Sequence, residues 1–223
     1  IKIIKENINI PLIADIHFDY KIALECVKSK VDGLRLNPGN IGDENRIKEV
    51  VLACKENNIP IRIGVNSGSI EKQFLEKYGV SAKAMVESAL SHVKILEKYN
   101  FDLIKISIKA TDIFKTIESY KLLAEYVNYP FHIGITEAGT LYNGIIKSSI
   151  GMGILLNEGL GDTIRVSLTA NPIEEVKAGI SILKNLNLKS EGIMFISCPT
   201  CGRAQDFTID VATQIENELK DIK

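Results

Sequence analysis

The chain has 223 residues, of which 45% are hydrophobic and 25% charged, and its formal net charge is −1. This length allows a large core, and the even charge balance argues against nucleic acid or a membrane surface as a partner. No apolar run is long enough to span a bilayer, and four cysteines without a dense framework favour a cytoplasmic protein over a secreted one.

Six apolar segments alternate along the chain with amphipathic helical patterns. The predicted strands are Leu12–His17, Gly33–Asn37, Ile61–Asn66, Leu103–Lys109, Phe131–Glu137 and Thr163–Leu168. The predicted helices between and after them include Asn45–Asn57, Ala82–Tyr99, Ile113–Val127 and Ile173–Leu186. This alternation predicts an α/β protein with a parallel sheet and right-handed crossovers.

A (βα)8 TIM barrel and a doubly wound sheet both fit this order of elements. The predicted strands alternate polar and apolar residues, as with Asp15 and His17 or Arg165 and Ser167. Barrel strands alternate in this way, whereas doubly wound strands read as continuous apolar runs. We therefore predict a TIM barrel, with two of its strands missing before Ile1. The sequence does not begin with Met, so we expect a fragment of a longer protein.

The segment Gly139–Asp162 is rich in glycine. We expect these glycines to allow close contact between a helix and the sheet. The alternative is a long loop followed by a tightly packed helix at the barrel mouth. Asn171 and Pro172 read as the cap and the first residue of the next helix. His92 lies in a helical pattern and His132 at the start of a strand, so both are assigned to the surface or to packing.

Cationic residues recur at the C-terminal ends of the predicted strands, where the active site of a TIM barrel lies. They are Arg35, Arg62, Lys109 and Arg165. Bringing these charges to one mouth is costly unless an anion neutralises them, so they predict a substrate with several phosphates. The small-residue turns at 37–42 and 66–69 fit the same ligand, because they let backbone N–H groups approach an anion.

Acid–base groups stand beside these cations. Asp15, His17 and Glu137 supply two carboxylates and an imidazole, which suit proton transfer or hydrogen bonds to substrate hydroxyls.

Cys198 and Cys201 form a Cys-Pro-Thr-Cys turn after a short apolar run. A tight turn aims two sulfurs at one point, so the pair is typical of half an iron–sulfur or zinc site, or of a redox dithiol. Cys26 and Cys54 lie in apolar helical patterns, and we expect them to be core thiols.

Six motifs, spread over essentially the whole chain, resemble those of the 4-hydroxy-3-methylbut-2-en-1-yl diphosphate synthase family. They are Pro11–Asp19, Leu34–Gly42, Ile59–Ser69, Gly134–Gly139, Gly161–Leu168 and Cys198–Arg203. The resemblance implies a dihydropteroate-synthase-like barrel over residues 1–188, containing strands three to eight. It also implies that residues 189–223 begin an iron–sulfur α+β domain.

The resemblance further implies an oxidoreductase of non-mevalonate isoprenoid biosynthesis. Such enzymes open the ring of 2-C-methyl-D-erythritol 2,4-cyclodiphosphate and remove a hydroxyl, which gives (E)-4-hydroxy-3-methylbut-2-enyl diphosphate. Ferredoxin or flavodoxin would donate the electrons, and the full-length protein would be a homodimer. The fragment alone is expected to be inactive.

Matching motif positions give the expected site residues. Substrate contacts fall on Arg35, Arg62, Asn66, Lys109, Thr136, Arg165 and Ser167. Catalytic roles fall on Asp15, His17 and Glu137, with Glu137 as the proton donor. Cys198 and Cys201 would hold a [4Fe-4S] cluster whose two other ligands are expected beyond Lys223.

Two other readings stay open. One is a redox-inert phosphate-binding barrel of the aldolase or pterin-synthase type, with a structural or zinc-binding Cys-Pro-Thr-Cys turn. The other is an independent binding module, against which the unpaired edges of a partial barrel argue.

Overall fold

The computed structural model describes residues 1–37, 41, 43–190, 193, 195–198 and 208–219. The chain forms two compact units, Ile1–Val176 and Lys177–Lys223. The expected domain boundary between residues 188 and 189 stays a prediction. Among the described residues, no helix combines the length and the apolar character needed to cross a membrane.

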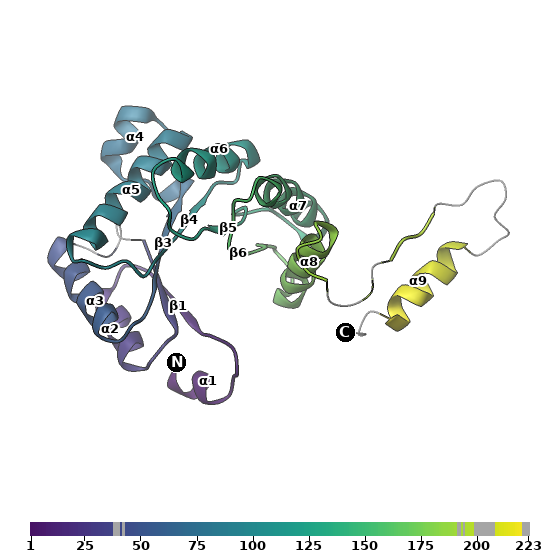
Figure 1. The fold of residues 1–223 in the computed structure, drawn as a ribbon, viewed down its shortest axis with the longest axis horizontal. Helices are drawn as coiled ribbons and strands as arrows, with labels where there is room; N and C mark the ends of the chain where they lie inside the picture. Colours follow the sequence, from purple (N-terminus) through teal and green to yellow (C-terminus); the bar gives the residue numbers. More distant parts are fainter. Residues whose placement is uncertain (38–40, 42, 191–192, 194, 199–207, 220–223) are drawn as a thin grey trace. The chain divides into compact units, whose positions relative to one another are not determined.

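The first unit is built on parallel strands that follow one another in chain order (Figure 1). One sheet contains β1 (Ile13–Ile16), β2 (Gly33–Leu36), β3 (Ile61–Asn66) and β4 (Ile104–Lys109). A second contains β5 (His132–Ile133) and β6 (Thr163–Ile164). A parallel bridge from Ile106 to Phe131 joins the two sheets. Every strand pairs with its neighbour in sequence, as in a TIM barrel. A doubly wound sheet reverses its strand order partway, so that alternative is wrong.

Helices link the strands and cover one face of the sheet (Figure 1). They are α2 (Tyr20–Lys28), α3 (Glu44–Glu56), α4 (Lys72–Tyr78), α5 (Ala82–Lys98), α6 (Ile113–Ala124) and α7 (Leu141–Asn157). A short α1 (Lys2–Glu6) precedes β1, and a 3-10 turn, η2 (Ser67–Ser69), follows β3. α8 (Pro172–Asn185) runs from the first unit into the second, which also holds α9 (Thr208–Leu219).

Side chains that accept hydrogen bonds from the first helical turn start several of these helices. Asp19, Asp43, Ser81 and Asp112 cap α2, α3, α5 and α6 in this way. Asn171 accepts a hydrogen bond from the backbone N–H of Ile173 at 3.0 Å, so the predicted start of α8 is confirmed.

The core lies between the sheet and the helices. Leu34, Ile61, Ile63 and Ile106 are all fully buried, and they alternate along the strands with polar residues that face the other way. The sheet therefore has an apolar face under the helices and a polar face that forms the barrel interior.

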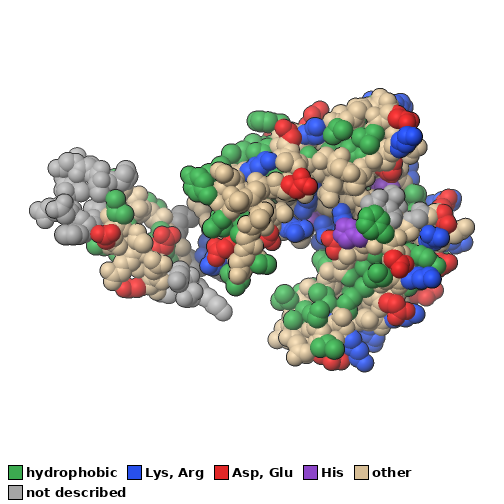
Figure 2. Space-filling view, turned by 180° about the vertical axis from the view of Figure 1, so that it is seen from behind, with side chains coloured by type: hydrophobic (Ala, Val, Ile, Leu, Met, Phe, Trp, Pro, Cys, Tyr) green, Lys and Arg blue, Asp and Glu red, His purple; other side chains and the backbone are tan. Residues whose placement is uncertain are grey.

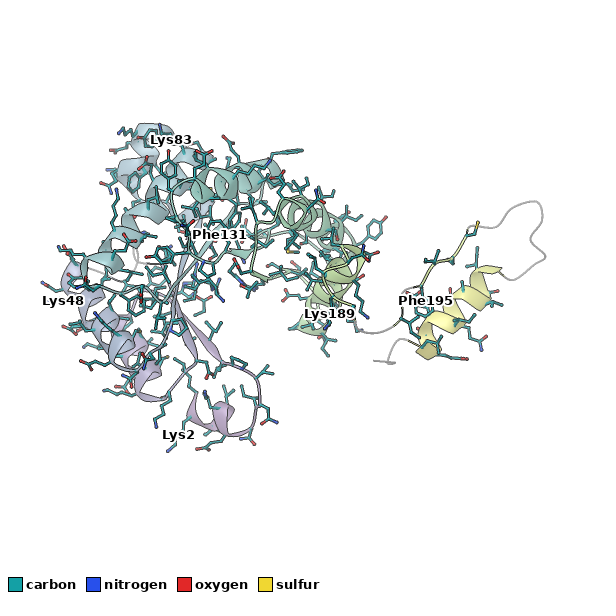
Figure 3. All side chains as sticks on the ribbon, viewed as in Figure 1. Lys2, Lys48, Lys83, Phe131, Lys189 and Phe195 are labelled. Carbon is teal, nitrogen blue, oxygen red and sulfur yellow. The ribbon has the colours of Figure 1, made fainter. Side chains whose placement is uncertain are left out.

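A buried tyrosine joins β4 to β5. The hydroxyl of Tyr120, on α6, accepts a hydrogen bond from the N–H of Ile108 at 3.0 Å and donates one to the carbonyl of His132 at 2.7 Å. Its ring lies 5.5 Å from that of Phe131, which immediately precedes β5 and is labelled in Figure 3. Tyr120 thus spans the place where the two sheets meet.

One expectation about local structure is wrong, and one alternative is excluded. The last two strands are shorter than predicted: their described ladder pairs are His132–Thr163 and Ile133–Ile164, and Glu137, at φ 52°, lacks the extended backbone of a strand. No long loop precedes α7, which begins at Leu141. The expected close helix–sheet contact is present, since a Cβ at Gly151 would lie 2.6 Å from Ile135.

Candidate active site

The register of the sheet brings the predicted polar residues to one side of the barrel interior. Asp15 lies beside Arg35, and Arg35 beside Arg62. Four residues further along β3, Asn66 lies beside Lys109. Figure 2 shows lysine, arginine and histidine side chains gathered in a hollow of the first unit. The hollow is therefore a cationic mouth at the C-terminal ends of the strands.

Arg35 is held rigidly at the floor of this mouth. Its side chain is 8% exposed, and Nη1 donates a hydrogen bond to Asp15 Oδ1 at 3.0 Å. Nη2 donates a longer one, of 3.4 Å, to the carbonyl of Gly64. A Cβ on Gly64 would lie 2.2 Å from Arg35 Nε. Only glycine at position 64 therefore leaves the guanidinium in place.

Arg62 is half-buried and poorly neutralised. Nη1 donates a 3.4 Å hydrogen bond to Ser107 Oγ, while the buried Nε has no hydrogen-bond partner among the described residues. Burial lowers the pKa of the Arg62 guanidinium, and the charge of Arg35 lowers it further. A buried donor of this kind favours an incoming anionic oxygen.

Lys109 is the most confined cation of the site. It is 8% exposed, and its Nζ would lie 3.2 Å from a Cβ on Gly134. Burial lowers the pKa of the Lys109 ammonium to about 7, and the charges of Arg62 and Arg165 add to this effect. No carboxylate of the described residues forms an ion pair with it. Lys109 therefore lacks a negatively charged partner among the described residues, and an anionic ligand could supply one.

The remaining predicted contacts lie just beyond β5 and β6. Arg165 is exposed, and its backbone N–H donates a hydrogen bond to the carbonyl of Ile133 at 2.9 Å. Thr136 and Ser167 are half-buried in the segments that continue these strands. Arg165 is close enough to lower the pKa of Lys109, so β6 contributes its charge to the same mouth.

A hydrogen bond joins the loops after β2 and β3. Asn37 Nδ2 donates to Ser69 Oγ at 2.9 Å, and the N–H of Asn66 donates to the same oxygen at 3.2 Å. Residues 38–40 and 42 of the predicted phosphate-binding turn lie outside the described residues. The turn at 66–69 is thereby hydrogen-bonded to Asn37, where the turn at 37–42 begins.

The predicted acid–base groups lie at two places on the mouth. Asp15 accepts the hydrogen bond from Arg35, and His17 Nε2 lies 3.4 Å from the same Oδ1. Glu137 is exposed, and its Oε2 accepts a hydrogen bond from Thr111 Oγ1 at 2.9 Å. The left-handed φ of 52° at Glu137 is uncommon for this residue type and aims its carboxylate from a tight turn.

The comparison with protein families decides what this barrel is. The family model described as the GcpE TIM-barrel domain matches residues 1–180. The chain belongs to the GcpE family.

Two relatives of this GcpE chain carry the same name. The protein named 4-hydroxy-3-methylbut-2-en-1-yl diphosphate synthase (flavodoxin) of Geobacter sulfurreducens is 58% identical over 220 residues, covering 98% of this chain and 62% of that protein. The protein of the same name from Wigglesworthia glossinidia brevipalpis is 56% identical over 222 residues, covering 99% and 61%. The chain spans about three fifths of the length of these relatives.

A solved structure agrees with the GcpE barrel assignment. Dihydropteroate synthase from Clostridium difficile matches with a TM-score of 0.51 and 16% identity, covering 82% of this chain and 70% of the other. At this identity the match concerns the fold alone, and it confirms the predicted barrel of the dihydropteroate-synthase type.

The cysteines of the GcpE chain fall into two groups. Cys26 and Cys54 are buried, as expected for core thiols, and burial raises the pKa of Cys54 to about 12. Cys198 is exposed and free, whereas Cys201 lies outside the described residues. Of the described cysteines, Cys198 alone has a thiol that a metal centre could reach, which fits the expected ligand role.

Two residues of the site were not found from the sequence. His132 was assigned to the surface or to packing, and burial together with the charges of Lys109 and Arg62 lowers the pKa of its imidazole to about 2. Its Nδ1 lies 2.9 Å from Thr163 Oγ1, and the buried Nε2 has no partner among the described residues. A neutral imidazole thus faces the cationic interior. Thr111, which binds Glu137, lies in a loop, where no periodicity marks the direction of a side chain.

Proposed function

We propose that the full-length protein carries out the reductive ring opening and dehydroxylation of 2-C-methyl-D-erythritol 2,4-cyclodiphosphate to (E)-4-hydroxy-3-methylbut-2-enyl diphosphate. The observation that carries this proposal is the cationic mouth. Arg35, Arg62 and Lys109 converge there, and of the three only Arg35 forms an ion pair with a described carboxylate, that of Asp15. The relatives at 54–58% identity, all named as this synthase, support the choice of substrate.

The mouth suits a cyclic diphosphate better than a single phosphate. Arg35 and Arg62 present planar forks of donors on adjacent strands, which match two phosphate oxygens at a time. Lys109 adds a point charge from the next strand, and Arg165 reaches the mouth from β6. Asn66 and Ser167 stand at the strand ends, where their side chains can bind ester or hydroxyl oxygens. The ligand would be anchored by its phosphates, with the carbon skeleton toward solvent.

The reaction takes up two electrons and one proton. One carbon–oxygen bond to the diphosphate breaks and opens the ring, and the neighbouring hydroxyl leaves as water. We assign the proton to Glu137, since its carboxylate lies at the exposed rim and Thr111 holds it. Asp15 and His17, which contact each other at the opposite rim, would orient the substrate hydroxyls.

The electrons require a redox group. We propose that Cys198 and Cys201 are two ligands of a [4Fe-4S] cluster, with the other ligands beyond residue 223. When bound, such a cluster supplies single electrons to the carbon–oxygen bond. We further propose flavodoxin as the donor, because the relatives carry that word in their names, and a cytoplasmic homodimer as the working form.

The test uses the full-length protein, reconstituted with iron and sulfide without oxygen. Visible absorption and EPR are recorded with and without the cyclodiphosphate, on the wild type, on Cys198→Ser and on Cys26→Ala. Cys26→Ala is the matched control, because this thiol is buried in α2. We expect a brown protein whose reduced EPR signal changes on adding substrate, with loss of colour in Cys198→Ser alone.

Other results have defined meanings. A colourless wild type that binds the cyclodiphosphate would support the redox-inert phosphate-binding barrel instead. A protein that does not bind the cyclodiphosphate would refute the proposed synthase function.

A further inference from the structure

A buried acid–base pair lies behind the site, outside the barrel interior. His92 on α5 is 4% exposed in its side chain, and its Nε2 lies 2.8 Å from Glu71 Oε1. Ser91 Oγ, on the same helix, donates a hydrogen bond to this oxygen at 3.3 Å. Glu71 Oε2 is buried without a hydrogen-bond partner among the described residues.

Burying the Glu71–His92 pair costs desolvation free energy. The α5 helix is otherwise buried through apolar residues such as Met85, Val93 and Leu96. Apolar side chains of similar size would pack in place of the pair without desolvating a charge, and they are often as stable or more so. Burial alone would raise the pKa of Glu71, but the contact with His92 outweighs it and lowers that pKa, so the carboxylate stays charged. The pair therefore calls for a reason other than packing.

The chain position of Glu71 supplies that reason. It is the N-cap residue of α4, although its side chain makes no hydrogen bond to that helix, and it lies two residues after Ser69 at the end of η2. Ile70 and Glu71 are both extended, at φ −74° and ψ 139° and at φ −63° and ψ 144°. Ile70 is 6% exposed. A segment this short and this extended has no slack, so a shift at Glu71 moves Ser69.

Ser69 connects this anchor to the mouth of the barrel. Its Oγ accepts the hydrogen bonds from Asn37 Nδ2 and from the N–H of Asn66. The chain of contacts therefore runs from His92 on an outer helix, through Glu71 and Ser69, to the two asparagines that end β2 and β3.

We propose that Glu71, held by His92 and Ser91, is a positioning residue that fixes Ser69 and through it sets Asn66 for the diphosphate. Glu71 does not touch the substrate itself. The inference rests on the proposed function, because it takes the cyclodiphosphate as the ligand of Asn66. It predicts that removing Glu71 weakens ligand binding only as long as Asn66 is present.

A double-mutant cycle tests this on the full-length protein, with the affinity for the cyclodiphosphate measured by calorimetry. We expect Asn66→Ala and Glu71→Ala each to weaken binding about tenfold. The double variant should bind about as weakly as Asn66→Ala alone, since residues that act through a shared contact are not additive. Glu71→Gln keeps an oxygen that can accept hydrogen bonds, so it should recover most of the affinity.

Leu123→Ala serves as the control for general destabilisation. Leu123 is fully buried on α6 and has no hydrogen bond to the loop after β3. It should lower the melting temperature at least as much as Glu71→Ala and leave the affinity unchanged. If Glu71→Ala does not fold, His92→Gln replaces it in the cycle.

Three results would overturn the proposal. They are full affinity in Glu71→Ala, strictly additive losses in the double variant, or an equal loss of affinity in Leu123→Ala. A wild type that does not bind the cyclodiphosphate would instead refute the proposed function, so the two failures are distinguishable.

Discussion

Lys109 leads to a prediction about protons. Burial and the neighbouring arginines lower the pKa of its ammonium from 10.5 to about 7. A bound diphosphate places negative charge beside Nζ, and an opposite charge at short range raises the pKa of an ammonium. We therefore expect the full-length protein to take up a proton when it binds the cyclodiphosphate above neutral pH.

The size of the effect follows from the two pKa values. At pH 8 a group with a pKa of about 7 is protonated in about one tenth of molecules, and one restored toward 10.5 in nearly all of them. Binding at pH 8 should take up about 0.9 proton per site, and about 0.5 at pH 7. The gap between 10.5 and about 7 corresponds to roughly 5 kcal/mol that the anion can recover in part.

The sign fixes the pH window. Because the free site holds fewer protons than the bound one, the affinity for the cyclodiphosphate is highest below about pH 7. It should then weaken by up to about tenfold per pH unit as the pH rises above that value.

Calorimetry measures this uptake directly. The cyclodiphosphate is titrated at pH 8 in Hepes and in Tris, whose ionisation enthalpies differ, and the difference in heat gives the number of protons. The ring phosphates are diesters and do not titrate near neutral pH. Lys109→Arg is the matched control, since a guanidinium stays charged and should take up no proton on binding. Equal proton uptake in the wild type and in Lys109→Arg, or none in either, would refute the reasoning.

Three further predictions concern single contacts. Gly64→Ala should displace the Arg35 guanidinium and weaken cyclodiphosphate binding at least about tenfold, with little change in melting temperature. Unchanged affinity in calorimetry would show that the guanidinium of Arg35 does not depend on glycine at position 64. Thr111→Val should lower kcat and leave KM nearly unchanged, while Thr111→Ser retains activity. In a Glu137→Gln background, Thr111→Val should cause no further loss of kcat. An undiminished loss of kcat in that background would show that Thr111 acts elsewhere. Tyr120→Phe leaves two buried backbone groups unpaired and should destabilise the protein by about 1–3 kcal/mol in chemical denaturation; a variant as stable as the wild type would show that water replaces the hydroxyl.

The barrel could be predicted because its strands obey a simple rule. Polar residues at every second position, such as Arg35 and Asn37 or Ser107 and Lys109, can face only a lined interior when helices cover the other side. The same parity placed the four predicted cations on one face. Chain order then brought them together, because each strand pairs with the next.

The contacts between loops could not be predicted in this way. The hydrogen bond from Thr111 to Glu137 joins residues 26 positions apart in loops, where no periodicity marks side-chain direction. His132 was assigned to the surface or to packing, because a lone histidine at a strand start carries no other signal. Its parity is that of Gly134, whose Cβ position faces Lys109, and this parity is the signal that points to the interior. The Glu71–His92 pair also escaped notice, since it needs the angle between α4 and α5.

The two kinds of cysteine have a practical consequence for labelling. Alkylating reagents are attacked by the thiolate, and a thiol such as that of Cys54, with a pKa of about 12, is almost never ionised at neutral pH. Cys26 is buried as well, and its pKa is also raised by burial. Under native conditions iodoacetamide should therefore modify Cys198 and spare both core thiols, so that mass spectrometry of the tagged peptides reports on the occupancy of Cys198. The same two core thiols become reactive on unfolding, and the rate of their modification would report the rate at which the barrel opens.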